Sequence, residues 1–215
     1  MANSNTPSGF TPMGSLISGP YNARARTYAI PTSDTSNSYA IGDVVMSAAS
    51  SDVNGVPYVQ KWGGVATTSA LPLGIIVGIV VVDAGVSQEG TVLDLTQTYI
   101  LAGTRTVVRY VRVNDDPMLI FTGQFDSTAI VAADLHKNAA VTVNASVAHT
   151  PAIPFSNMVL TSPATTATLA VRLMGAVQRP DNAVGAYVDC ICKWNYHEYG
   201  VTSGASGTIV SYLAP

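Results

Sequence analysis

Apolar and polar residues alternate most regularly near the end of the chain. The even positions from 186 to 196 are apolar or aromatic, and the odd positions include Asp189, Lys193, Asn195 and His197. This period of two residues indicates a half-buried β-strand, because successive side chains of a strand point to opposite faces. The segment 168–177 has the same pattern, and the turn-rich sequence QRPDNAVG separates the two. We therefore expect two antiparallel strands here.

Further segments with strand composition follow one another along the chain at short spacing. They include YAIGDVVMSA, VPYVQKW after the hairpin signal Asn54-Gly55, the apolar run GIIVGIVVV with a kink at Gly78, and RYVRV followed by MLIF. Only the segment 126–141 has helical composition, which predicts at most one short helix. We predict an all-β fold, an antiparallel β-sandwich, jelly roll or barrel. No internal repeat of the usual solenoid length is visible.

The periodic region is flanked by two segments of different composition. Residues 1–27 are rich in Ser, Asn, Gly and Pro and predict an extended N-terminal arm. Residues 28–200 are expected to form a single β-rich domain, followed by a flexible tail over 201–215 with a short terminal strand. That strand can pair with another subunit or with its own domain. Isolated apolar and basic residues of the arm and tail are the candidate partner-binding residues: Phe10, Leu16, Ile17, Tyr21, Arg24, Arg26, Ile209, Tyr212 and Leu213.

The chain carries unusually few charges for its size. Charged residues make up 11% of its 215 residues, against roughly 25% in an ordinary globular domain. Such a surface favours a component of an assembly, whose neighbours cover it. The net charge of −3 gives no general attraction to nucleic acid or to an anionic membrane. The longest apolar run is too short to span a bilayer, and the first residues lack the pattern of a secretion signal.

Candidate catalytic residues are few. Asp115 and Asp116 are the only adjacent acidic pair, but they stand between two strand-like segments and before Pro117. Asn and Asp bond to their own backbone in turns, and a proline excludes helical geometry from the residue before it. We interpret the pair as a turn and not as a metal or catalytic site. The sequence has none of the common enzyme signatures, so we expect no enzyme activity and no cofactor.

The remaining chemistry-bearing residues have structural interpretations. Cys190 and Cys192 are two positions apart, too close for an unstrained disulfide, and are expected to be reduced and buried. The histidines His136, His149 and His197 are interpreted as surface or interface residues. A carbohydrate-binding β-sandwich with a host-adhesion role is an alternative function, for which Trp62, Tyr58 and Tyr99 are the candidate aromatic residues.

Several motifs in this order resemble virion structural proteins of tailed bacteriophages, especially short-tailed ones. They are MANSNTPSGFTPM, YAIGDVV, RYVRVNDDPMLIFTGQ, TTATLAVRLMGAVQRPDNAVG and KWNYHEYG. The chain is similar to small capsid-associated proteins of the head decoration, or cement, type. The resemblance implies a β-rich domain on the virion's capsid surface that binds the major capsid protein and copies of itself, as a trimer or dimer, and bridges capsomers. A head–tail connector or tail-tube protein is the alternative within the virion.

Overall fold

The computed structural model describes residues 3–17, 19–64, 70–80, 96–144, 154–166, 168–203 and 209–211, the backbone alone for 201–203 and 209–211. The fold is nearly all β, built of antiparallel sheets and a closed barrel, as the sequence predicted. The one helix among the described residues is a 3-10 turn at Ala132–Asp134. The strands are β1 Thr11–Ser15, β2 Gly19–Pro20, β3 Arg26–Ile30, β4 Tyr39–Ala40, β5 Val44–Ser51, β6 Pro57–Lys61, β7 Gly74–Ile79, β8 Tyr99–Ile100, β9 Arg109–Asn114, β10 Leu119–Gln124, β11 Asn138–Val143, β12 Met158–Ala164, β13 Val171–Ala176, β14 Asp189–Trp194, β15 Val201–Ser203 and β16 Ile209–Ser211.

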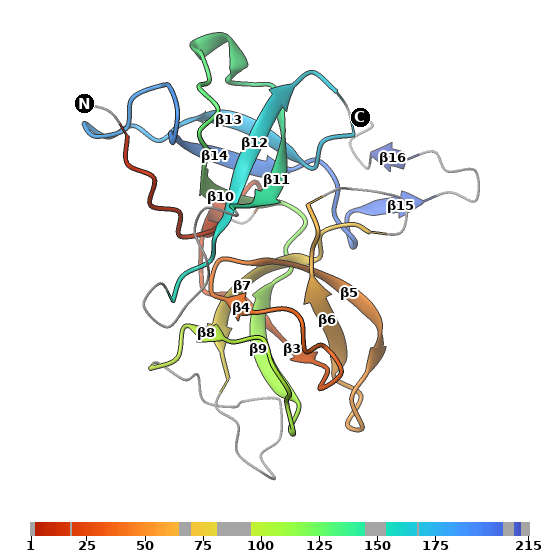
Figure 1. Ribbon diagram of the computed structural model, residues 1–215. Coiled ribbons are helices and arrows are strands. Elements are labelled where there is room, and N and C mark those ends of the chain that lie inside the picture. Colours follow the sequence, from red (N-terminus) through yellow and green to blue (C-terminus); the bar gives the residue numbers. More distant parts are fainter. Residues whose placement is uncertain are drawn as a thin grey trace.

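A closed barrel forms the lower half of the molecule in Figure 1. Its five strands follow the order β3-β6-β5-β7-β9, and β9 pairs back with β3. Alternate residues of these strands point inward, because the side-chain period of a strand is two. The inward residues make a compact apolar core that includes Tyr28, Val45, Val59, Ile76 and Val111.

A larger sheet forms the upper half and has the order β12-β11-β13-β14-β10-β1-β2. It curls, because the chain leaving β10 forms a parallel bridge from Phe125 to Leu160 of β12, and the Asp126 amide donates to the Leu160 carbonyl at 2.9 Å. We call the unit made of β1, β2 and β10–β14 the curled sheet. Its core contains Phe10, Phe121, Leu173, Cys192 and Trp194 among other residues.

The barrel and the curled sheet follow one plan. The spatial order β3-β6-β5-β7-β9 corresponds to β10-β12-β11-β13-β14 when strands are matched in chain order. In each unit the first and third strands are parallel neighbours, joined by the pair Ala29 and Tyr58 or the pair Phe125 and Leu160. All other pairings within the two five-stranded sets are antiparallel.

The register of the two units also agrees, residue by residue, around a shared bulge. Ile76 pairs with Val113 and Gly78 with Arg112, with Val77 left over. Leu173 pairs with Cys192 and Gly175 with Ile191, with Met174 left over. The Ile76 amide donates to the backbone carbonyl of Asp43, and the Leu173 amide donates to the backbone carbonyl of Lys137, both at 2.9 Å. Because topology, register and bulge all coincide, we infer that the chain contains two copies of one five-stranded unit.

The two units are joined by buried contacts and not by a loose linker. The Phe10 amide donates to the Gly42 carbonyl at 2.9 Å, and the Ser156 hydroxyl donates to the Asp43 carboxylate at 2.6 Å. Val44, Trp62 and Ile75 come from the barrel side and pack into the core of the curled sheet. The two repeated units therefore share buried surface.

Part of the segment 1–27, which was predicted as an extended arm, packs against the curled sheet. β1 pairs with β10 as an inner strand of the curled sheet. Phe10 is 1% exposed and stacks edge-on against Phe121, with ring centroids 5.6 Å apart. It lies over Gly123, where a Cβ would collide with its ring. A single phenylalanine in a polar segment gives no sequence period, so the sequence pattern did not indicate that Phe10 is buried. Its ring packs in the space above Gly123, which has no side chain.

At the other end, β15 and β16 pair with each other in an antiparallel hairpin. The terminal strand, for which the sequence left two partners open, thus has a partner in its own chain. Ile209 belongs to β16, whereas Tyr212 and Leu213 lie outside the described residues.

Several local predictions are confirmed. β14 alternates as expected, with Cys190 and Cys192 buried, free and inward. Burial and the neighbouring Asp189 carboxylate raise the pKa of Cys190 to about 12, so its thiol stays protonated. The hairpin at Asn54-Gly55 connects β5 and β6, with Gly55 at a φ of 82°. The predicted kink of β7 at Gly78 is the bulge.

Candidate functional site: a projecting hairpin

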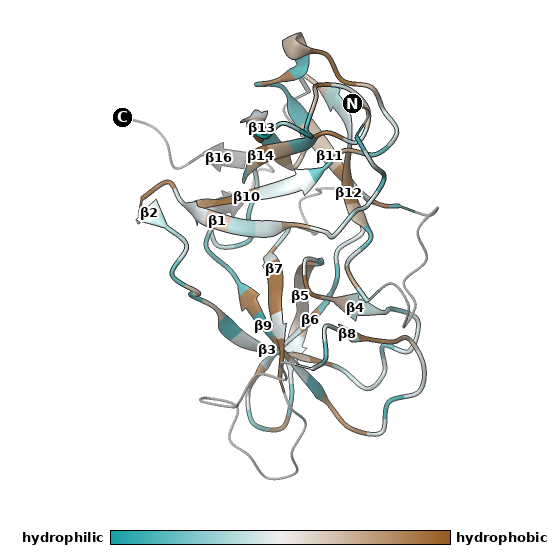
Figure 2. Cartoon of the chain, turned by 90° about the vertical axis from the view of Figure 1, so that its left-hand side faces the viewer, coloured by the Kyte–Doolittle hydropathy of each residue, from teal (hydrophilic) through white to brown (hydrophobic). Residues whose placement is uncertain are grey.

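Two of the candidate partner-binding residues, Leu16 and Ile17, lie with Met13 on the β1–β2 hairpin, and all three have exposed apolar side chains. Met13 and Leu16 are each 47% exposed and Ile17 is 80% exposed. We call these three side chains the apolar tip. Figure 2 shows the hairpin at the outer edge of the curled sheet, where β2 is the last strand. An apolar cluster of this kind is typical of a contact surface.

Backbone contacts hold the hairpin in place and leave the apolar tip outside. The Leu16 amide donates to the Met118 carbonyl and the Tyr21 amide to the Met13 carbonyl, each at 3.0 Å. Gly19 has a φ of 81°, which favours glycine. A Cβ at Gly14 would lie 2.8 Å from the Gly19 carbonyl oxygen, so the two strands approach closely only because Gly14 lacks a side chain.

A polar cluster lies beyond the hairpin, at the start of β3. The Arg26 side chain is 71% exposed, its Nε lies 3.5 Å from Asp115, and its guanidinium lies 6.0 Å from the centre of the Tyr199 ring. The Tyr28 hydroxyl donates to Asp115 at 2.8 Å and lies 3.1 Å from the Tyr199 hydroxyl. Burial and these neighbours raise the pKa of Tyr28 above its usual range, so the phenol stays neutral. Arg26 thus presents a positive charge beside an aromatic ring.

The structure brings together most of the residues predicted in the N-terminal segment. Leu16 and Ile17 form the apolar tip with Met13, and Tyr21 and Arg24 line a small depression beside Gly14. Burial raises the pKa of Tyr21, although a bond with Asn114 and the nearby Arg112 oppose the shift. Phe10 is different, because it lies in the chain's own core.

Met13 and Tyr199 were not predicted. Met13 stands in the same polar segment as Leu16 and is one more isolated apolar residue, which is the signal that applied to its neighbours. Tyr199 is 52% exposed and reaches Arg26 from the far end of the chain. No pattern within the sequence connects positions so distant from each other.

The acidic pair is a turn, as predicted. The Asp116 amide donates to the Asn114 side chain at 3.1 Å, and the Met118 amide donates to the Asp116 carboxylate at 2.8 Å. The side chain of Asp115 is only 14% exposed, because Tyr28 and Arg26 engage it. Asp116 thus closes the turn, while Asp115 holds Tyr28 and Arg26 in the polar cluster.

The candidate aromatic residues for carbohydrate binding lie in different settings. Trp62 is 1% exposed, and its indole N–H donates to the Ala70 carbonyl at 3.0 Å, so it is a core residue. Tyr58 and Tyr99 are half-buried and lie on β6 and β8, which belong to different sheets.

His197 was expected at the surface or in an interface, and this prediction is wrong. It is 2% exposed, because β14 ends at Trp194 and the chain then turns inward between Trp194 and Tyr199. Burial lowers its pKa to about 4, although a bond with Leu73 and the charges of Asp115 and Asp116 oppose the shift. The exposed His136 agrees with the prediction, and His149 lies outside the described residues.

Acid should destabilise the protein through His197. The imidazole has a pKa of about 4 in the folded chain against 6.5 in the unfolded chain, so the unfolded chain binds more protons between these values. The free energy of unfolding should therefore fall as the pH drops through this window, by roughly 3 kcal/mol in total. Urea unfolding at several pH values measures it. His197→Phe should flatten the profile and His136→Asn should not; an unchanged profile in His197→Phe would contradict the assignment.

Within the described residues, no group of three or more His, Cys, Asp or Glu side chains could hold a metal ion. No helix in the part of the chain that the structure describes is long and apolar enough to cross a membrane.

Comparison of the chain with known protein families, with curated proteins and with solved structures finds no match.

Proposed function

We propose that this chain is a non-catalytic structural protein of a tailed-bacteriophage head, a decoration or cement protein that binds the outside of the capsid. The observation that carries the proposal is the apolar tip of the β1–β2 hairpin, with three large side chains presented to solvent at a sheet edge. The resemblance of the ordered sequence motifs to head proteins supports the same function, as does the low content of charged residues.

The apolar tip suits insertion between capsid subunits. Fully burying a Leu, Ile or Met side chain contributes about 1.5–3 kcal/mol. Arg26, beside the hairpin, adds a charge that can pair with a carboxylate of the major capsid protein. The two repeated units give a stiff body, since buried contacts join them. A stiff body loses little conformational entropy when it binds.

Binding that exists only when two capsomers are adjacent opposes their separation by mass action. Many copies in one lattice, assembled as trimers or dimers, add avidity. The protein would in this way raise the free energy required to pull the shell apart under the outward pressure of packaged DNA. This function requires no catalytic residue, no cofactor and no contact with DNA or membrane.

The apolar tip should be required for capsid binding and not for folding. Leu16→Asp combined with Ile17→Asp should weaken binding to purified capsids that lack this protein by at least about tenfold, because two apolar contacts are replaced by buried charges. Co-sedimentation across a concentration series measures the occupancy. Val53→Asp is the matched control, since Val53 is fully exposed on the β5–β6 hairpin.

Equal capsid occupancy of the double variant and the control would refute the role of the apolar tip. Electron cryo-microscopy of the virion tests the location, and the proposal requires density over the head surface in many copies. A single ring of density at the neck or along the tail would instead identify a connector or tail-tube protein.

A further inference from the structure

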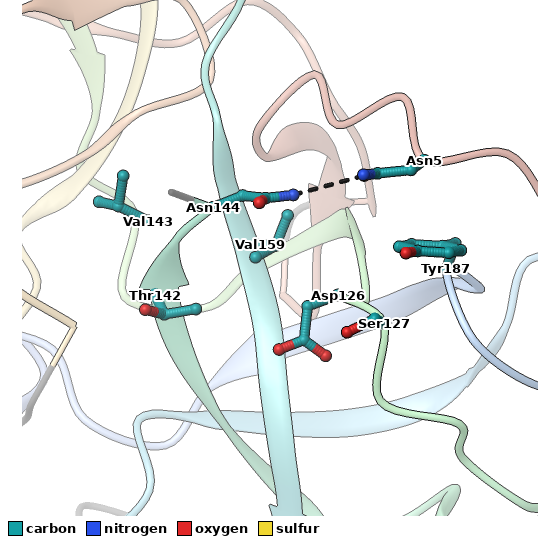
Figure 3. Close-up of a pocket in the computed structure, with 8 residues that line it drawn as sticks. All are labelled: Asn5, Asp126, Ser127, Thr142, Val143, Asn144, Val159 and Tyr187. Atoms are coloured by element: carbon teal, nitrogen blue, oxygen red, sulfur yellow. Dashed lines mark hydrogen bonds between the residues drawn. The ribbon is translucent and has the colours of Figure 1, made fainter. Parts of the chain in front are cut away.

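A polar pocket of about 220 Å³ opens at one end of the curled sheet, away from the residues of the proposed capsid contact. Its lining combines one carboxylate, two amides, two aliphatic hydroxyls, one phenol and two valines, from Asp126, Asn5, Asn144, Ser127, Thr142, Tyr187, Val143 and Val159. Figure 3 shows Asp126, Ser127 and Tyr187 grouped on one side, while a hydrogen bond of 3.3 Å from Asn144 to Asn5 crosses above them. Segments distant in sequence thus converge on one small space.

Backbone contacts fix the acidic side of the pocket. The Asp126 amide donates to Leu160 at 2.9 Å, its carbonyl accepts from the Tyr187 amide at 3.0 Å, and its carboxylate accepts from the Thr128 amide at 2.8 Å. Burial raises the pKa of Asp126, but hydrogen bonds from Thr128 and Thr161 outweigh this and lower it, so the group is ionised. Tyr187 has a φ of 58°, an unfavourable backbone conformation for an aromatic residue that these contacts maintain.

The repeated architecture provides an internal comparison. By the shared register, the barrel has Pro31, Ala48 and Tyr58 where the curled sheet has Asp126, Thr142 and Val159. In the barrel, Pro31 and Ala48 thus stand where the curled sheet has the hydrogen-bonding side chains of Asp126 and Thr142. The large Tyr58 stands where the curled sheet has the smaller Val159. The five-stranded plan therefore does not require the polar residues, which belong to the curled sheet alone.

We propose that this pocket binds a neutral, hydroxyl-rich ligand, one saccharide unit of a glycan. Sugar hydroxyls can donate to the Asp126 carboxylate and accept from the Asn5 and Asn144 amides, and the Tyr187 ring offers an apolar surface to the sugar's C–H groups. The volume lies below that of a drug-sized site, which suits one sugar ring. The lining has no cationic residue, and its single carboxylate repels anions. This inference is independent of the capsid contact, because the apolar tip does not line the pocket.

Saturation-transfer NMR on the isolated full-length protein tests the site without any capsid. The probes are D-glucose, D-galactose, N-acetyl-D-glucosamine and L-rhamnose, with D-glucuronate as a charged comparison. At least one neutral sugar should receive saturation, and glucuronate should receive less because of the Asp126 charge. Asp126→Asn keeps the shape and an acceptor for Thr128, but should weaken neutral-sugar binding at least about tenfold and remove the discrimination against glucuronate.

Asp181→Asn is the matched control, since the side chain of Asp181 is 68% exposed and outside the pocket. Amide shifts of the unmodified protein locate the contact independently of any variant, and they should change at residues 126, 127, 142 and 187. No transfer to any neutral sugar, shift changes elsewhere, or equal binding by Asp126→Asn and Asp181→Asn would each overturn the proposal.

Discussion

Replacing Asp43 by alanine is expected to lower the free energy of unfolding by about 3–5 kcal/mol, among the largest effects of any single substitution in this chain. Asp43 is fully buried at the junction of the two units. Its carboxylate accepts from the Ala40 amide at 2.9 Å and from Ser156 at 2.6 Å, and it lies 3.0 Å from the Lys61 ammonium. Alanine would leave the largely buried ammonium and the hydroxyl without this partner, and unpaired buried charge is strongly destabilising.

Urea unfolding followed by circular dichroism measures the loss. The double variant Asp43→Ala with Lys61→Met removes both charges and should recover part of the stability, because no uncompensated charge remains. The variant Lys137→Ala is a useful comparison, since its ion pair with Asp134 is more exposed and should contribute less than about 1 kcal/mol. Equal effects of Asp43→Ala and Lys137→Ala would contradict the structural role of the junction.

Phe10→Ala should cost about 3–5 kcal/mol, because it empties a large site in the core of the curled sheet. The ring is 1% exposed and packs against Phe121 and over Gly123. From the other side of the same contact, Gly123→Ala should cost about 1–3 kcal/mol, since the added Cβ would collide with the Phe10 ring. Thermal and urea unfolding of the single variants and of the double variant test the contact.

The double variant should be more stable than the sum of the single effects predicts, because the smaller residue at position 10 relieves the collision at position 123. Leu16→Ala is the control, as its side chain is 47% exposed and should change stability by less than about 0.5 kcal/mol. If Phe10→Ala were as mild as Leu16→Ala, residues 3–17 would be a peripheral arm after all, and the packing described for β1 would be wrong.

The repeated plan gives the two units separate roles. The barrel has a uniform apolar core, while the curled sheet carries the added β1–β2 hairpin and the polar pocket. Both proposed sites thus lie on the second unit, where the sequence has departed from the shared plan. The barrel has the same five-stranded plan without the hairpin or the pocket, so the plan itself does not require them. Both features can therefore serve in binding.

The sequence by itself determined the fold class, because the period of two residues in segments such as 186–196 is a local property of the chain. It determined the turn at Asp115 and Asp116, the hairpin at Asn54-Gly55 and the kink at Gly78, because Gly, Pro, Asn and Asp restrict the backbone over a few residues. It also indicated Leu16 and Ile17 as exposed apolar residues in a polar segment.

Only the tertiary structure decided which distant residues meet. The alternation in 186–196 continued to His197 in the sequence, but the strand ends at Trp194 and His197 turns into the interior. Phe10 belongs to the core because Gly123, far away in the chain, has no side chain. The two repeated units cannot be recognised in the sequence, because they share strand pairings and register while most of their side chains differ. Local patterns specify strands, but long-range packing selects their partners, and that selection creates the junction, the projecting hairpin and the polar pocket.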